Sequence, residues 1–284
     1  MLRRLLASLA LAVCLTPAAA HALFGTPGPG ARLLQPPSQY FLPMEAGALD
    51  SHADLQILYT MYSLTVPGVG DTSTNVFGMG ADGQLALFDR FQVGVNIPFL
   101  SYHGTDFVAA STSDVRFGNM LLRLKYKVLG SSSGPLALSV FVNTLLPTSS
   151  GVPTHDFAAV QPGVAASFGL SRITLNAALS LYESFTSDTN VVSALMLDIH
   201  AAIKVLFLAP YLGFQLGEPM AGRLPDSDTV GHTPAIALSA GVQFFPLSFL
   251  HIDLGTRIAL NDNGKVFYGS LGRATLVFGA GVRF

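Results

Sequence analysis

Residues 273–284, RATLVFGAGVRF, carry the pattern that decides the fold. Every second residue from 276 to 282 is apolar, whereas the residues between them are mostly small or polar. A period of two places the apolar residues on one face of a β-strand. The strand ends on Phe284, and an apolar residue at a free chain end would fray into water. The pattern therefore predicts a last strand that is held in a sheet and turns one face to an apolar environment.

The same alternation recurs along most of the chain and predicts about twelve strands. Their ranges are 53–65, 75–88, 91–102, 116–128, 136–146, 157–169, 172–183, 191–205, 207–217, 234–245, 250–260 and 266–284. Each is long enough for the about 9–11 residues with which a tilted strand crosses a bilayer. Short turns alternate with longer polar loops, an asymmetry that is typical of outer-membrane barrels and has no reason in a β-sandwich.

The two faces of the predicted strands differ in polarity, as expected for strands that cross a membrane. In residues 91–99, FQVGVNIPF, one face carries large apolar side chains and the other Gln, Gly, Asn and Pro. Residues 250–260 divide in the same way, with His, Asp and Arg on the polar face. This indicates a wet lumen, and because lipid offers the backbone no hydrogen-bond partner, the sheet must close. We therefore predict an all-β fold, a transmembrane up-and-down antiparallel β-barrel whose last strand pairs with the first.

Composition agrees with a lipid-facing surface. Hydrophobic residues make up 50% of the 284 residues, and charged residues only 11%, less than half of the usual share. No apolar run beyond the first residues is long enough for a transmembrane helix. The balance of 15 Lys and Arg against 17 Asp and Glu gives no reason to expect a nucleic-acid partner.

The amino terminus carries the features of an export signal. Arg3 and Arg4 precede an apolar stretch, and AHA at 20–22 supplies a cleavage site of the A-x-A type. We expect cleavage near Ala22. A lipoprotein modified on Cys14 is the less favoured alternative, because a bulky valine precedes that cysteine.

These features divide the chain into three regions. Residues 1–22 are the predicted signal peptide for export, and together with the barrel pattern they predict a location in the outer membrane of a diderm bacterium. Residues 23–50 are rich in Pro and Gly and lack a sustained period, which predicts a periplasmic lead-in or a plug. Residues 51–284 are the predicted barrel.

Three runs resemble the outer-membrane family labelled putative MetA-pathway of phenol degradation. They are VGVNIPFL at 93–100, GNMLLRLKYKVL at 118–129 and GPLALSVFVNTLLPTSSG at 134–151. Lys125-Tyr126 is the most specific part. The Gly-Asp and Pro-Thr-Gly elements of the family are Gly-Asn at 118–119 and Pro-Thr-Ser at 147–149 in this chain. The resemblance implies a transport-type protein with links to aromatic or other apolar substrates.

The end of the chain resembles a second known signal. A terminal Phe preceded by alternate apolar residues, here Phe278, Val282 and Phe284, is similar to the carboxy-terminal signal by which outer-membrane barrels are recognised for assembly. The resemblance implies the barrel-assembly machinery as a partner, beside outer-membrane lipids.

Charged side chains on the polar faces form the candidate site. By the alternation they point into the lumen: Arg123, Lys125, Lys127, Arg172, Asp198, His200, Lys204, Asp253, Arg257 and Arg273. If the row from Arg123 to Lys127 lines a water-filled constriction, it selects solutes by charge. The alternative is a structural network of ion pairs, with carboxylates such as Asp82, that fills a narrow barrel. Both interpretations stay open.

Other short motifs lack the context that their chemistry requires. GMGADG at 78–83 has the spacing of a dinucleotide fingerprint and GSSSG at 130–134 that of a nucleophile elbow, but neither leads into a helix. His103, His155 and His232 fall in predicted long loops at wide spacing, which favours solvated residues over a metal site. We therefore predict no catalytic residue, no metal and no cofactor.

The function predicted from the sequence is that of a channel or transporter. Its solutes would be small or hydrophobic molecules, aromatic ones included. The alternatives are a plugged structural barrel and an outer-membrane enzyme that modifies lipids. An open lumen separates the first function from the other two.

Overall fold

The computed structural model describes residues 44–66, 70–104, 115–131, 134–148, 157–170, 172–186, 192–221, 233–261 and 274–284. Its strands are β1 (His52–Val66), β2 (Gly70–Leu87), β3 (Phe91–Gly104), β4 (Val115–Phe117), β5 (Met120–Gly130), β6 (Leu136–Leu146), β7 (Phe157–Leu170), β8 (Ile173–Thr186), β9 (Val192–Ile203), β10 (Leu208–Ala221), β11 (Ala235–Leu247), β12 (Leu250–Ala259) and β13 (Ala274–Arg283). These residues include no helix long and apolar enough to cross a membrane.

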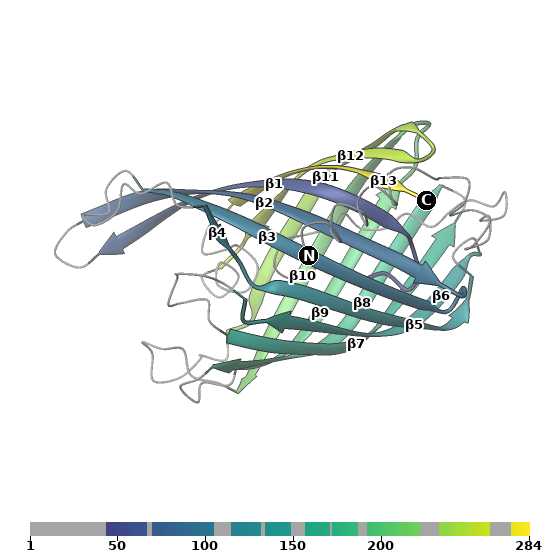
Figure 1. Ribbon diagram of the computed structural model, residues 1–284, viewed down its shortest axis with the longest axis horizontal. Coiled ribbons are helices and arrows are strands. Elements are labelled where there is room, and N and C mark those ends of the chain that lie inside the picture. The colour runs from purple at the N-terminus through teal and green to yellow at the C-terminus, as the bar shows by residue number, and fades with distance from the viewer. Residues whose placement is uncertain are drawn as a thin grey trace, which may run out of the picture.

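The strands close into one antiparallel barrel (Figure 1). Neighbours along the chain pair with each other, and β1 pairs both with β2 and with β13, starting at His52↔Arg283. β4 and β5 both pair with β3 and together make one barrel strand, so that the wall has twelve strands. The predicted all-β barrel and its closure by the last strand on the first are confirmed.

A proline explains why β4 and β5 are separate. The strand opposite them, β3, contains Pro98, which has no N–H to donate to the ladder. Gly118 N bonds to Pro98 O at 3.0 Å, and the interrupted strand is held from its other side by Thr148. Thr148 Oγ1 donates to Gly118 O at 3.1 Å and accepts from Met120 N at 2.8 Å. The Pro-Thr element seen in the sequence thus bridges the gap.

The two faces of the wall are opposite in polarity. Large apolar side chains point outward, and Leu212 and Leu254 are 68% and 58% exposed. Inward positions carry polar side chains, and Gln215 and Gln243 are fully buried. The apolar belt and the polar interior are the pattern expected of strands between lipid and lumen.

The connections follow the predicted asymmetry with one exception. Short turns at 88–90, 204–207 and 248–249 lie at one end, and the described strands that flank residues 105–114 and 222–232 reach the other end. The loop predicted at 66–74 is wrong, because β1 and β2 stay paired as far as Val66↔Gly70. Pairing along β1 holds this segment as a strand although it contains the turn formers Gly70 and Asp71. This hairpin projects beyond the rest of the wall in Figure 1.

The carboxyl terminus lies at the end with the short turns. Phe278 is exposed on the outer face, and Arg283 is buried on the inner face. Phe284 N donates to Ser51 O at 3.1 Å, just before β1 begins. The last residue is therefore tied to the first strand, as the alternation up to Phe284 predicted.

The segment that precedes β1, residues 44–51, runs inside the barrel, and all eight of its residues are buried. Ser139 Oγ donates to Gly47 O, Ala48 N donates to Ser167 Oγ at 3.2 Å, and Asp50 N donates to Gln92 Oε1 at 2.9 Å. Met44 lies against Gly213 of β10. We call residues 44–51 the lumen segment.

Candidate functional site

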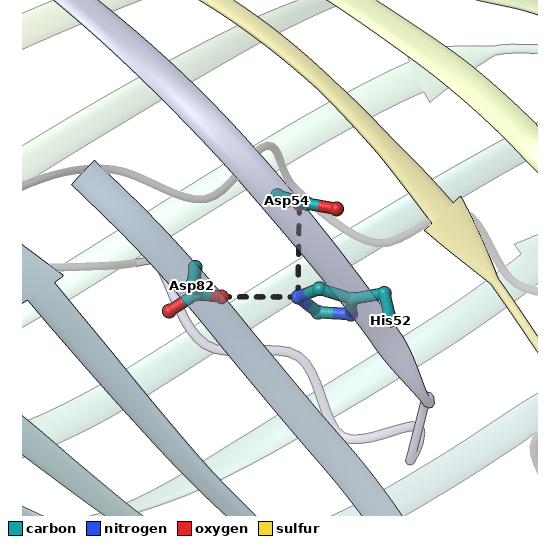
Figure 2. A group of neighbouring side chains, drawn as sticks. All are labelled: His52, Asp54 and Asp82. Carbon is teal, nitrogen blue, oxygen red and sulfur yellow. Dashed lines mark hydrogen bonds and ion pairs between the residues drawn. The ribbon is translucent and has the colours of Figure 1, made fainter. Parts of the chain in front are cut away.

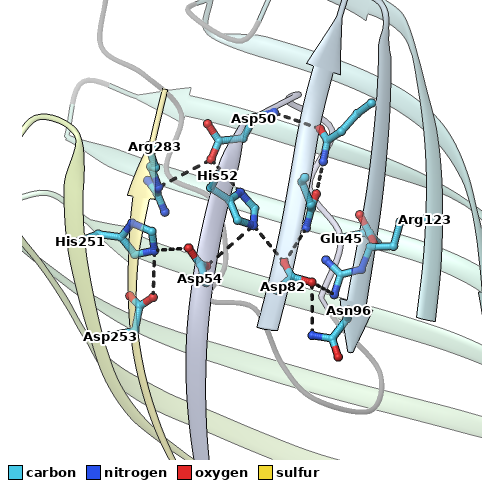
Figure 3. Close-up of polar contacts among 12 residues, drawn as sticks. Glu45, Asp50, His52, Asp54, Asp82, Asn96, Arg123, His251, Asp253 and Arg283 are labelled. Atoms are coloured by element: carbon cyan, nitrogen blue, oxygen red, sulfur yellow. Dashed lines mark hydrogen bonds and ion pairs between the residues drawn. The ribbon is translucent and has the colours of Figure 1, made fainter. Parts of the chain in front are cut away.

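The barrel interior brings together a cluster of histidines and carboxylates at the short-turn end (Figure 3). His52 Nε2 lies 3.0 Å from Asp82 Oδ2 and 3.8 Å from Asp54 Oδ2. On the other side of Asp54, His251 Nε2 lies 3.1 Å from Oδ1 and 3.6 Å from Asp253 Oδ2. Strands β2, β1 and β12 supply these side chains, although β1 and β12 are far apart in the sequence. Closure of the barrel creates the cluster.

The last strand leaves room for this cluster because it has a glycine between β1 and β12. Gly281 pairs with Asp54 on one side and with His251 on the other. A Cβ at Gly281 would meet Asp54 Oδ1. The missing side chain lets the Asp54 carboxylate reach across β13 to the His251 ring.

The basic row on β5 is paired with acids. Arg123 Nη2 lies 3.2 Å from Asp82 Oδ1, and Lys125 Nζ lies 2.7 Å from Glu45 Oε2 of the lumen segment. Glu45 Oε1 also accepts from Asn143 Nδ2 at 3.3 Å. Two of the three cations in the row are therefore neutralised by carboxylates, one on the wall and one on the lumen segment.

A chain of polar contacts continues around the wall. Ser167 Oγ donates to Asn176 Oδ1 at 2.6 Å, and Asn176 Nδ2 lies 3.3 Å from His200 Nδ1. The His200 ring packs on Tyr211, with 5.3 Å between the ring centroids. Buried polar groups need hydrogen-bond partners. Here the wall and the lumen segment provide such partners for each other, as in the bonds of Ser167 and Ser139 to residues 47–48.

The charged residues predicted to point inward divide into four groups. Six are buried in the interior: Arg123, Lys125, Asp198, His200, Asp253 and Arg257. Lys127 is half-buried beside an irregularity in the β5–β6 pairing. Arg273 lies outside the described residues, as do His155 and His232 among the predicted loop histidines, whereas His103 lies within β3.

Arg172 and Lys204 are not buried in the interior. Arg172 lies in the turn between β7 and β8, and Lys204 follows the end of β9; both are exposed. Strand alternation was extended past the points where these strands end, and in a turn the face of a residue no longer follows a period of two. Lys204 instead lies 6.0 Å from the Phe245 ring.

Four ionisable residues of the interior were not predicted from the sequence. Glu45 and Asp50 lie in the lumen segment, where Pro and Gly hide any period, and His52 precedes the first predicted strand. Asp54 lay inside that strand, and its alternation with Gln56 was the signal that could have found it. All four are buried.

The most specific element of the resemblance has a defined place. Lys125 contacts the lumen segment, whereas its neighbour Tyr126 lies near the short-turn end. The Tyr126 ring packs on Phe91 at 4.9 Å, and its hydroxyl accepts from Arg90 Nη1 at 3.2 Å. The pair therefore joins the interior to the turn after β2.

Comparison with known proteins agrees with this architecture. The COG4313 outer membrane channel from Pseudomonas putida F1 has a TM-score of 0.59 at 13% identity, covering 88% of this chain and 100% of that one. The NanC porin structure has a TM-score of 0.51 at 8% identity, covering 81% of this chain and 98% of that one. No curated protein sequence matches significantly. At these identities the likeness shows the fold, which is that of outer-membrane barrels.

A sequence model for one family matches residues 63–277. That range runs from β1 to β13 and includes the Lys125-Tyr126 pair and the Pro-Thr element that bridges β4 and β5. Since it covers more than half of the chain, the chain belongs to the family described as "Putative MetA-pathway of phenol degradation".

Proposed function

We propose that this protein is an outer-membrane channel for small or hydrophobic solutes, aromatic ones included. The observation that carries the proposal is a closed barrel with an apolar outer belt and a polar interior. The similar fold of the Pseudomonas putida protein, described as an outer-membrane channel, supports it. The name of the family, which refers to phenol degradation, supports aromatic solutes.

We propose the lumen segment as the plug or gate of this channel. The segment crosses the interior. Met44 lies against β10, and at the other end the backbone N–H of Asp50 donates a hydrogen bond to Gln92 of β3. Its contacts with the wall combine ion pairs near its two ends, Glu45 with Lys125 and Asp50 with Arg283, with neutral hydrogen bonds between them. Such contacts can exchange with water one at a time, so that solutes can pass when the segment shifts.

The remaining steps of the proposal concern how the protein reaches the membrane. The signal peptide is removed near Ala22, and the assembly machinery recognises the end that contains Phe278, Val282 and Phe284.

The two alternative functions, a plugged structural barrel and a lipid-modifying enzyme, receive less support. A plugged structural barrel needs a fixed lumen segment, and a lipid-modifying enzyme needs a nucleophile or metal at the outer face, for which the described residues give no motif.

A matched pair of solutes tests the proposed solute class. We expect proteoliposomes that contain the mature protein to take up phenyl glucoside at least as fast as glucose, although the aromatic sugar is larger. The physical reason is that buried aromatic side chains such as Phe141 and Tyr211 lie among the polar groups of the interior and can pack against an aromatic ring. Swelling rates of the vesicles measure the uptake.

Vesicles without protein and vesicles with heat-unfolded protein are the controls. Uptake of glucose alone would support a channel but reject the proposed preference for aromatic solutes. Uptake of neither solute by vesicles that hold folded protein would favour the plugged structural barrel.

A further inference from the structure

Two carboxylates face each other in the β1–β2 ladder. Asp54 and Asp82 occupy directly opposed register positions and both point inward, where they are buried. Like charges in such a pair repel, and the repulsion is strongest away from water. A cation is therefore expected between them, and His52 Nε2 points at this place (Figure 2).

The three ligand atoms have the spacing of a metal site. Each of His52, Asp54 and Asp82 offers one atom, and these atoms all lie within 4.8 Å of one another. His52 Nε2 is 3.0 Å from Asp82 Oδ2 and 3.8 Å from Asp54 Oδ2. Ligands about 2.0–2.1 Å from a tetrahedral Zn²⁺ lie about 3.3–3.4 Å from one another. The two observed distances bracket that value.

Each of these ligands is oriented by a second group behind it. His52 Nδ1 lies 3.3 Å from Asp50 Oδ2, which fixes the ring with Nε2 toward the carboxylates. The second oxygen of Asp54 faces His251 Nε2, and the second oxygen of Asp82 faces Arg123. Outer partners of this kind, above all a carboxylate behind a histidine, are typical of bound metal ions.

The charges of the cluster are unequal unless a cation is added. Four carboxylates, those of Asp50, Asp54, Asp82 and Asp253, meet two guanidinium groups, those of Arg123 and Arg283. With neutral imidazoles, these six groups of the described residues carry two more negative than positive charges, and an excess of buried charge is costly. One divalent ion removes the excess. Two protonated histidines would also do so, and the experiment separates these cases.

We propose that His52 Nε2, Asp54 Oδ2 and Asp82 Oδ2 bind one divalent transition-metal ion, of which Zn²⁺ is the best fit. A histidine nitrogen among the ligands favours Zn²⁺ over Mg²⁺ and Ca²⁺, which prefer oxygen alone. The ion ties β1 to β2 next to the seam where β1 meets β13. It is distinct from the predicted loop histidines, and the proposal does not rest on channel activity.

The test uses the full mature protein, folded in detergent and treated with a chelator. After dialysis against Zn²⁺, we expect one bound ion per chain by elemental analysis. Co²⁺ at the same site should give the d–d absorption of a four-coordinate ion with three protein ligands. Bound Zn²⁺ should raise the temperature at which the barrel loses its fast migration on gels.

Four variants locate the ion. His52→Gln removes a ligand and should abolish stoichiometric binding, and Asp50→Asn should weaken it about 10–100-fold by losing the group behind His52. His200→Gln changes a buried histidine of the same barrel outside the cluster and should keep Zn²⁺ binding. Asp253→Asn alters the neighbouring triad of Asp54, His251 and Asp253 and should also keep it. Gel migration verifies that each variant is folded.

Three results would overturn the proposal. If the chelated wild-type protein binds neither Zn²⁺ nor Co²⁺, the cluster is balanced by protonated histidines. If binding survives in folded His52→Gln, the ion lies elsewhere. If Asp253→Asn loses binding and His52→Gln keeps it, the triad around His251 holds the ion instead.

Discussion

Phe284→Asp should remove most of the assembled barrel from the outer membrane while leaving export intact. The backbone of Phe284 is bonded to Ser51, and its strand closes the barrel on β1. A charge on the last residue weakens this seam and destroys the terminal aromatic signal, whereas the predicted signal peptide is unchanged. Heat-modifiable migration of membrane fractions on gels measures the assembled barrel.

Two variants make this result specific. Phe284→Tyr keeps an aromatic end and should restore assembly. Phe88→Asp introduces the same charge at an exposed phenylalanine, 88% accessible, in the turn between β2 and β3, and should assemble normally. Wild-type amounts of folded Phe284→Asp protein would refute a role of the last residue in assembly.

Arg123→Gln should cost about 3–5 kcal/mol of the free energy of unfolding, the usual cost of leaving a buried charge without its partner. Asp82 Oδ1 loses the guanidinium at 3.2 Å, whereas the Asn96 amide at 3.3 Å, which stays, is neutral. The measurement is the temperature at which the barrel unfolds, taken in chelator so that bound metal does not contribute.

The control lies on the same strand. Lys127 is half-buried and makes no ion pair within the described residues, so Lys127→Gln should change stability by about 0–1 kcal/mol. Adding Asp82→Asn to Arg123→Gln removes the unpaired charge and should recover much of the loss. If Arg123→Gln instead shifts the reversal potential toward cations at unchanged stability, the row selects solutes by charge.

The strands could be predicted from the sequence because a period of two is a local property. Lipid outside and polar groups inside imposed that period on nearly every barrel segment, and closure followed from the chemistry of the bilayer. The β1–β2 hairpin is the exception. Gly70 and Asp71 are turn formers, yet both are paired with β1, up to Val66↔Gly70, because pairing along a neighbouring strand outweighs local turn preference.

The interior could be predicted only in part. Alternation placed Arg123 and Lys125 inside, but it gives no partner, since a partner depends on which strands and segments meet in space. Glu45 could not be assigned to Lys125 because the lumen segment has no period, and the cluster around His52 forms only when β1 meets β2 and β12. Long-range contacts of this kind carry the candidate site.

Planar-bilayer conductance is the most direct test of the central claim that solutes pass through a lumen limited by residues 44–51. Gly47 is the point at which that segment can be loosened. A Cβ there would meet Ala137 O and come within 2.7 Å of Ser167 N and 2.8 Å of Ala165 O, all backbone atoms of the wall. Gly83→Ala is the matched control, because its Cβ meets no atom within 4 Å.

We predict discrete ion currents from the wild-type protein, larger or more frequent currents from Gly47→Ala, and wild-type currents from Gly83→Ala. All three proteins should migrate as folded barrels before they are added to the bilayer. No current from either the wild-type protein or Gly47→Ala, with both folded, would contradict the channel and leave a plugged structural barrel.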